Sequence, residues 1–274
     1  MSISTALVAE REKSKPTSTT FRESSVAVSL DAVVSLEDVS VSFRVPKEKI
    51  VSLKEYAIRF MKGQTLEEEF QALKKVSVEI NRGEILGVIG RNGAGKSTLM
   101  KVIARVLKPS GGRLRTTGYV SPLLELGAGF HPDLTGRENI FLNGTLLGHS
   151  NAKMGSRFND IVDFAELWDF IDAPLRTYSS GMAARLGFAT ATAFQPDILL
   201  LDEVLSVGDE RFHQKCLSRI EEFKAAGTTF VIVSHQSDFI RTKCDRALWL
   251  DRGKVRLIGE AGQVIEKYQS FLYS

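Results

Sequence analysis

The chain has 274 residues, of which 43% are hydrophobic and 25% are charged, with a formal net charge of +3. This composition fits a globular protein of one large or two small domains. The charge is too small to indicate nucleic acid binding, no apolar run of about 18 residues predicts a membrane span, and two cysteines without metal-type spacing fit a reducing cytosol.

The first sixty residues contain a polar extension, a strand and an amphipathic segment. Residues 1–30 are rich in Ser, Thr and charge, which predicts a disordered and dispensable extension. Apolar alternation from Val34 to Phe43 predicts a strand, with a bulge at Glu37-Asp38. Apolar residues at helical spacing follow over 50–61. That helix either covers the edge of the domain or meets a partner or a membrane interface.

Residues 73–98 carry the strongest motif. Alternating residues 73–80, a turn at 81–83 and an apolar strand over 85–89 predict a hairpin. The second strand leads into Gly-x-x-x-x-Gly-Lys-Ser at 90–97, and apolar residues at helical spacing follow. A glycine-rich loop between a strand and a helix is the context of a phosphate-binding P-loop. A dinucleotide fingerprint would need G-x-G-x-x-G, whereas the order here is G-x-x-G-x-G.

The P-loop predicts a nucleoside triphosphate and Mg²⁺ as ligands. Glycines let the backbone N–H groups turn toward the phosphates, and the helix N-terminus adds a partial positive charge. We expect Lys96 to reach the β- and γ-phosphates and the Ser97 hydroxyl to bind Mg²⁺. The residues expected to surround the phosphates are Gly90, Arg91, Asn92, Gly93, Ala94, Gly95, Lys96, Ser97 and Thr98.

The second half of the chain predicts an α/β domain. Residues 113–120 read as a strand, and about 130–195 as a mostly helical subdomain with a capping box at Thr135-x-x-Glu138 and a helix from Ser180. Two buried strands follow over 198–203 and 228–233, separated by a helix over 212–225, and then a hairpin over 247–258 and a terminal helix over 260–272. Strands alternating with helices indicate a mostly parallel central sheet.

Polar side chains follow two of these strands. Asp202 and Glu203 end one strand, and His235 follows another. Ligands of open parallel sheets bind at the carboxyl ends of the strands, so these residues converge on the P-loop if the strands are neighbours. In that case Asp202 would bind Mg²⁺, Glu203 would act as general base toward water, and His235 would contact the γ-phosphate.

From residue 34 to 258 the chain resembles the ATP-binding subunits of ABC transporters. Tyr178-Ser-Ser-Gly-Met182 stands where that family has its signature sequence, and Ser206-Val-Gly-Asp209 resembles its D-loop. The resemblance implies a homodimer in which Ser179, Ser180 and Gly181 of one subunit meet the ATP of the other. It also implies a separate membrane-spanning permease. Phe43 is either the aromatic residue that stacks on adenine or an ordinary strand residue.

Departures from the common family pattern point to one subgroup. Ser180 and Met182 replace the commoner Gly and Gln, and the Gln of the Q-loop is absent, with Glu125 as one candidate for its place. The signature variant, the segment 124–139 and the helix 50–61 resemble exporters of O-antigen and teichoic acid. In that subgroup the Leu-Gly loop, here 124–130, and the N-terminal helix lie near the permease and a lipid-linked glycan.

The resulting prediction is an α/β P-loop ATPase of ABC type, with an antiparallel β subdomain, an ATP-binding domain over 31–260 and a C-terminal helix over 261–274. It would power export of a lipid-linked surface polysaccharide from the cytoplasmic face of the inner membrane. One alternative is an ABC ATPase for another cargo, such as a drug, peptide or nutrient. A second alternative, a translation or DNA-repair ATPase, usually carries two ATPase halves or a long coiled coil.

Overall fold

The computed structural model describes residues 31–46, 67–124, 126–202 and 209–273. Five elements form its N-terminal part: β1 (Ala32–Pro46), β2 (Glu67–Asn81), β3 (Ile85–Ile89), α2 (Lys96–Ile103) and β4 (Gly111–Thr116). The predicted segments 1–30 and 50–61, together with Glu125, Glu203 and residues 206–208 of the D-loop, lie outside the described residues.

The next six elements are one strand and the parts of a helical region. They are β5 (Val120–Leu123), α3 (Gly136–Leu146), α4 (Asn151–Ala165), the short turns η1 (Trp168–Phe170) and η2 (Leu175–Thr177), and α5 (Ser180–Ala191). The chain then returns to the sheet through β6 (Ile198–Asp202), α6 (Glu210–Ala225), β7 (Thr229–Val233), α7 (Ser237–Lys243), β8 (Arg246–Asp251), β9 (Lys254–Glu260) and α8 (Ala261–Tyr273).

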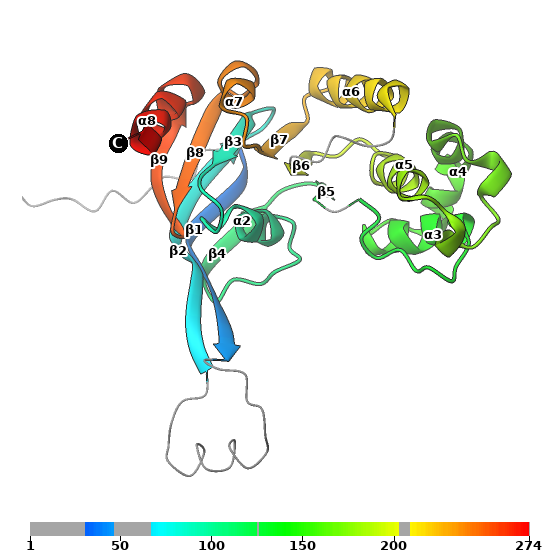
Figure 1. The fold of residues 1–274 in the computed structure, drawn as a ribbon, viewed down its shortest axis with the longest axis horizontal. Helices are drawn as coiled ribbons and strands as arrows, with labels where there is room; N and C mark the ends of the chain where they lie inside the picture. Colours follow the sequence, from blue (N-terminus) through cyan, green and yellow to red (C-terminus); the bar gives the residue numbers. More distant parts are fainter. Residues whose placement is uncertain (1–30, 47–66, 125, 203–208, 274) are drawn as a thin grey trace, which may run out of the picture.

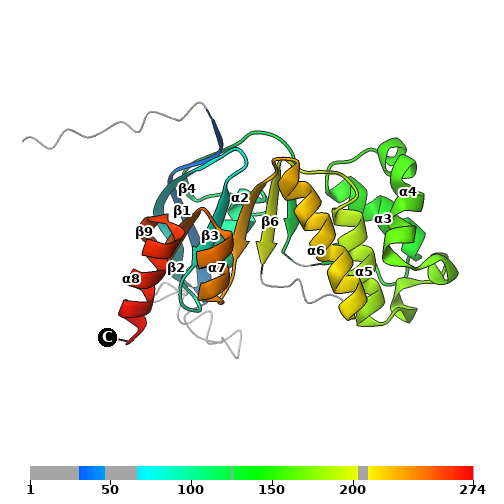
Figure 2. The ribbon, with the colours of Figure 1, turned by 90° about the horizontal axis from the view of Figure 1, so that it is seen from above.

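Two sheets organise the molecule. The larger sheet has the order β5-β6-β7-β3-β8-β9, with all neighbours parallel except the antiparallel pair β8/β9. The smaller sheet has the order β2-β1-β4 and is antiparallel. Helices α3, α4 and α5 lie together at one end of the molecule, beyond the β5 edge of the larger sheet (Figures 1 and 2).

Alternate residues of the central strands fill two hydrophobic cores. In β3, Leu86 and Val88 join one core with α2, β1 and β2, while Ile85 and Ile89 join the other with α6, α7 and α8. This division follows from the period of two along a strand, and it explains why β3 is buried at every position. A third core lies within the helical region and contains Ile140, Met154 and Leu186.

The hairpin predicted for 73–89 is wrong. The turn exists, with Gly83 at φ 73°, but β2 pairs with β1 while β3 lies between β7 and β8 in the other sheet. The backbone N–H of Gly83 donates to the Thr229 hydroxyl at 2.9 Å, which fixes the turn on the start of β7. The chain therefore changes sheets at this turn. The strand predicted over 113–120 similarly divides into β4 and β5, which belong to different sheets.

Several local predictions are confirmed. The bulge in β1 lies between Leu36 and Val39, with Asp38 at φ 49°. The capping box of α3 forms, since the Thr135 side chain accepts from the backbone N–H of Glu138 while the Glu138 carboxylate accepts from that of Thr135. The predicted hairpin of residues 247–258 is the antiparallel pair β8/β9. Helix α7 was not predicted, because a seven-residue helix with one buried residue gives little periodicity.

Candidate nucleotide site

The P-loop lies between β3 and α2 and is held by close backbone contacts. A Cβ added to Gly90, whose φ is 150°, would lie 2.3 Å from the carbonyl oxygen of Leu250. At Gly95, with φ 107°, it would lie 2.7 Å from the carbonyl oxygen of Ala72. The backbone N–H of Gly253 donates to the Ala94 carbonyl at 2.9 Å. Glycine is therefore required at both ends of the loop for lack of space as well as for the backbone angles.

Lys96 begins α2 and lies inside this loop. Its side chain is buried, and Nζ donates to the carbonyl oxygens of Gly90 at 2.7 Å and Arg91 at 3.2 Å. Ser97 and Thr98 follow in the first turn of α2, where backbone N–H groups have no partner within the helix. One loop thus combines a buried ammonium group with a helix N-terminus, an arrangement suited to a polyphosphate.

The sheet brings the three predicted strand ends together. Strand β7 lies between β6 and β3, so that Asp202 is opposite Val233 and Val233 is opposite Val88. Gly90 follows Val88 by two residues, and His235 follows Val233 by two. The P-loop, Asp202 and His235 therefore share one edge of the sheet. The sequence analysis expected these residues to converge if their strands were neighbours, and the strand order β6-β7-β3 meets that condition.

Phe43 is on the long β1–β2 ribbon that extends below the sheets in Figure 1. Its side chain is exposed, and its cross-strand partner is Phe70, which is exposed as well. Two residues beyond Phe70, Ala72 contacts the P-loop through the carbonyl oxygen beside Gly95. The exposed position of Phe43 on this ribbon is compatible with contact to a base.

The signature segment begins α5. Ser179 is the N-cap, and its hydroxyl accepts a hydrogen bond from the backbone N–H of Met182 at 3.2 Å. Ser179 and Ser180 are exposed, and Gly181 is half-buried. Tyr178 is anchored differently from the residues that follow it: its hydroxyl donates to the Phe170 carbonyl at 2.7 Å. Ser179, Ser180 and Gly181 thus present the N-terminus of α5 at the surface.

A cavity of about 640 Å³ lies beside this N-terminus. Its wall includes Asp209, which caps α6 by accepting from the backbone N–H of Phe212 at 2.9 Å. That hydrogen bond, together with the nearby Arg185 guanidinium, holds the pKa of Asp209 below its ordinary value. The cavity is lined by Glu166, Leu167, Phe170, Ser179, Ser180, Gly181, Met182, Ala184, Arg185 and Asp209.

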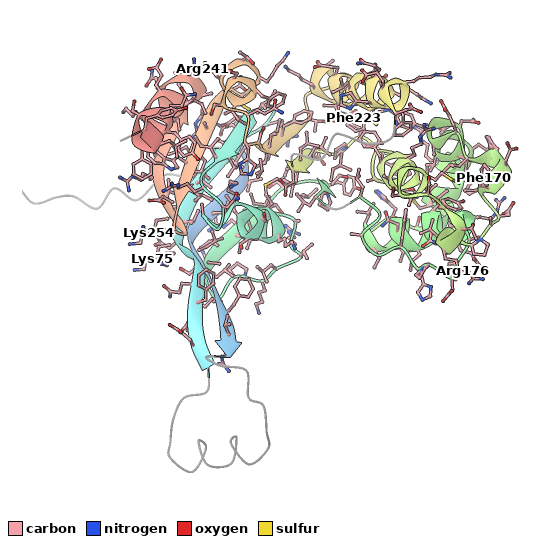
Figure 3. The ribbon with its side chains drawn as sticks, viewed as in Figure 1. Lys75, Phe170, Arg176, Phe223, Arg241 and Lys254 are labelled. Carbon is pink, nitrogen blue, oxygen red and sulfur yellow. The ribbon has the colours of Figure 1, made fainter. Side chains whose placement is uncertain are left out.

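The P-loop and the signature segment of one chain lie in different parts of the molecule, the first beside the sheets before α2 and the second in the helical region at the start of α5 (Figure 1). Lys254 follows Gly253, the residue bonded to the P-loop at Ala94, and Phe170 lines the signature cavity. Figure 3 places Lys254 on the sheet side and Phe170 at the far end of the helical region. The two groups of residues are therefore on separate surfaces of the chain, and the family resemblance implies that they meet across two subunits.

Three charged residues near the signature segment escaped the sequence interpretation. They are Arg185 of α5, Glu166 at the end of α4 and Lys215 of α6, and both cations form ion pairs with Glu166. Arg185 occurs five residues after Ser180, so its place on the signature helix was the one available signal. Glu166 and Lys215 carried no such signal, since their proximity arises only from tertiary packing.

The loop over 126–130 is held between α3 and α5. The Asn143 side chain donates to the Ala128 carbonyl at 2.9 Å, and a Cβ added to Gly187 of α5 would lie 2.6 Å from the backbone nitrogen of Gly127. Asn139 is buried, and its side chain accepts from the backbone N–H of His131 at 2.7 Å. Motif 124–139 therefore includes side chains that fix the loop's backbone, as well as exposed residues such as Ala128 and Gly129.

Comparison with known proteins identifies the class. A family model described as "ABC transporter" matches residues 73–206. Two solved structures have the same fold at 22% identity. One is an ATP-binding cassette dimer in a post-hydrolysis state bound to ADP and Pi (TM-score 0.63, covering 83% of this chain and 98% of that chain). The other is an ATP binding subunit of an ABC transporter (TM-score 0.64, covering 86% of this chain and 93% of that chain). The chain belongs to the ATP-binding proteins of ABC transporters, a family of ATPases.

Relatives with higher sequence identity are named for the export of O-antigen or teichoic acids. The O-antigen export system ATP-binding protein RfbB of Klebsiella pneumoniae is 46% identical over 78% of this chain and 85% of its own length. The protein of that name in Myxococcus xanthus is 44% identical over 88% of this chain. The teichoic acids export ATP-binding protein TagH of Enterococcus faecalis is 44% identical over 74% of this chain. The chain spans 56% of the length of the Myxococcus protein and 45% of the Enterococcus protein.

Proposed function

We propose that this protein is the ATP-hydrolysing subunit of a transporter that exports a lipid-linked cell-surface polysaccharide through a separate permease. The observation that carries the ATPase part is the alignment of Gly90, Asp202 and His235 along one edge of the sheet. The cargo rests on likeness, because the Klebsiella pneumoniae and Enterococcus faecalis relatives are named for O-antigen and teichoic acid export.

The residues present fit Mg²⁺-ATP. Mg²⁺ prefers oxygen ligands and keeps several from phosphate and water, so the Ser97 hydroxyl and the Asp202 carboxylate suffice as protein ligands. Among the described residues no group of three or more acidic, His or Cys side chains forms a metal cage of its own, which agrees with an ion that arrives with a nucleotide. When bound, the ion would neutralise charge on the β- and γ-phosphates.

Each residue has a definite task in this proposal. The loop N–H groups and Lys96 Nζ hold the phosphates and stabilise charge that moves to the leaving oxygen. Glu203 accepts the proton of the attacking water, and His235 donates a hydrogen bond to the γ-phosphate. The water oxygen bonds to the γ-phosphorus while the bond from that phosphorus to the β–γ bridging oxygen breaks; Glu203 takes one proton of the water, and ADP and inorganic phosphate are the products. Phe43 would stack on the base.

A homodimer completes the site. Within one chain, α2 and the P-loop before it lie beside the sheets, whereas the first turn of α5 lies in the helical region (Figure 1). In this proposal that turn, the signature turn of Ser179, Ser180 and Gly181, therefore meets the P-loop of another chain. Helix N-termini bind anions, and α5 would present its N-terminus to the partner's γ-phosphate. One similar cassette was solved as a dimer. Asp209 would lie near the same interface.

The permease and the location follow from the class. Among the described residues no helix combines the length and apolar content that a bilayer crossing requires. The proposed subunit binds a permease at the cytoplasmic face of the inner membrane, with 50–61 and 124–130 toward the permease and the glycan. We also propose an ATP-binding domain over 31–260 with a helical subdomain over about 130–195, and a C-terminal helix over 261–274, after an extension over 1–30.

The test compares host cells that carry wild-type protein with cells that carry Lys96→Ala. Lipid-linked polysaccharide is extracted from the cell surface and from the inner membrane. The proposal predicts loss of surface polymer and its accumulation on the inner membrane. Unchanged surface polymer, with ATP hydrolysis abolished in the purified variant, would reject the polysaccharide as cargo while keeping the ATPase.

A further inference from the structure

Glu166 joins three helices at one carboxylate. It ends α4 in the left-handed conformation, with φ 59°. Lys215 of α6 donates to Oε1 at 2.8 Å, and Arg185 of α5 lies 3.4 Å from Oε2. The two cations come from the helices on either side of the signature cavity. The end of α4 is thus bound to both helices through one side chain.

Arg185 extends this cluster to Asp209. Its Nη2 donates to Asp209 Oδ2 at 2.5 Å, and its guanidinium lies 5.0 Å from the centre of the Phe212 ring. The Arg185 side chain is only 19% exposed, which limits the screening of its two ion pairs by water. Glu166 and Asp209 thus hold Arg185 from two sides, and two cations balance two carboxylates.

The charges of the cluster agree with this geometry. The hydrogen bond from Lys215 lowers the pKa of Glu166, so that Glu166 is ionised at neutral pH. Lys215 also donates to the Phe164 carbonyl at 3.0 Å, near the end of α4. The ammonium group therefore links α6 to α4 through both a side chain and the backbone. Loss of the Glu166 charge would remove one of the two carboxylates that Arg185 pairs with among the described residues and leave Asp209.

Three members of this charged cluster also form part of the wall beside the signature turn. Glu166, Arg185 and Asp209 line the cavity of about 640 Å³ into which Ser180 and Gly181 also face. Arg185 is on the signature helix itself, and Asp209 is the N-cap of α6. The position of the signature turn relative to Asp209 thus depends on how Arg185 is held.

We propose that Glu166 is a positioning residue for ATP hydrolysis: through Arg185 and Lys215 it fixes the N-terminus of α5 for the γ-phosphate bound by a partner subunit. This inference rests on the proposed function, in which two chains complete each other's sites. In this proposal Glu166 contacts neither the nucleotide nor the attacking water. Its effect is therefore confined to steps that need the partner's signature turn, and ATP binding to a single P-loop is independent of it.

The test uses the purified full chain and Glu166→Gln, which removes the charge at nearly constant size. We expect kcat to fall about fivefold, as for loss of one partly buried ion pair. The dissociation constant for ATP, measured on protein dilute enough to be monomeric, should stay unchanged. ATP-driven dimerisation should require more nucleotide. A merely structural role would lower the thermal stability and ATP binding together.

Asp160→Asn is the matched control. Asp160 is also on α4, and its ion pair with Arg157, at 2.8 Å, stays within that helix and is exposed. This variant should keep the wild-type kcat. A second variant, Lys215→Gln, tests the path: combined with Glu166→Gln it should cost less than the sum of the two single changes, because both remove the Glu166–Lys215 ion pair.

Two results would overturn the proposal. One is a wild-type kcat in Glu166→Gln, and the other is a fall in ATP affinity equal to the fall in kcat. Failure of the proposed function gives a different result: wild-type protein would then hydrolyse ATP no faster than Lys96→Ala. Wild-type and Lys96→Ala rates are therefore measured first, and the Glu166 comparison is made above that background.

Discussion

The P-loop and the signature segment are fixed in different ways. Backbone contacts hold the P-loop: Gly90 lies against the Leu250 carbonyl, and Lys96 is buried against the loop's own carbonyl oxygens. Side-chain charges hold the signature helix, through Arg185 and Glu166, and its first turn is exposed. The surface proposed to bind ATP is thus held by backbone contacts and a buried lysine, whereas the surface proposed to meet a partner is held by ion pairs between side chains.

The largest expected effect comes from the P-loop side. Lys96→Ala should lower the ATP hydrolysis rate by at least about a hundredfold, because it removes the buried ammonium group inside the loop. Phosphate release by the purified chain measures it. Lys101→Ala is the control, since Lys101 is on the exposed face of the same helix. Equal rates for the two variants would contradict the role of Lys96.

On the signature side, Gly187→Ala should destabilise the protein. The added Cβ would lie 2.6 Å from the backbone nitrogen of Gly127, so that helix α5 and the loop 126–130 must separate, at a cost of about 1–3 kcal/mol. Urea denaturation measures the free energy of unfolding. Gly155→Ala, in helix α4 with nothing within 4 Å of the added Cβ, should instead raise it by about 0.5–1 kcal/mol. A gain in stability for both variants would disprove the close packing.

Thr135→Ala tests the capping box at the start of the helical region. Loss of the hydroxyl that accepts from the Glu138 N–H should cost about 1 kcal/mol of unfolding free energy. Thr135→Ser keeps the hydroxyl and should recover most of this loss. Equal losses in the two variants would show that the methyl group, rather than the cap, is responsible.

The smallest effect is a pH dependence of the charged cluster. Since the folded-state pKa of Glu166 is lowered, mainly by Lys215, its stabilising contribution is present above the unfolded pKa of about 4.5 and is lost as the pH falls through the folded value. The stability difference between wild type and Glu166→Gln should therefore narrow as the pH drops below 4.5. Unfolding midpoints across that range measure it. A difference that is the same at every pH would contradict an ionised Glu166.

Local chemistry in the sequence predicted much of the fold. The P-loop, the capping box and the apolar strands each depend on residues close together in the chain, and the structure has all of them. The meeting of Gly90, Asp202 and His235 was predictable because parallel strands expose their carboxyl ends at one edge. Which strands are neighbours required the structure.

The errors have a common cause. The turn at Gly83 looks like a hairpin turn, yet the choice of sheet was decided by Thr229 and Phe230 of β7, far along the chain. The Glu166 cluster likewise unites residues from three helices, and no periodic pattern records such a meeting. The roles of Glu203, Glu125 and residues 50–61, all outside the described part of the chain, stay predictions.

The most direct test of the proposal that two chains complete each other's nucleotide sites is the mass of purified Glu203→Gln in solution. It is measured by sedimentation with and without ATP. If each chain completes the other's site and hydrolysis is blocked, the variant should be a dimer with ATP and a monomer without it, while the same variant with Lys96→Ala added should stay a monomer. A monomer that binds ATP at full affinity and never dimerises would contradict the account.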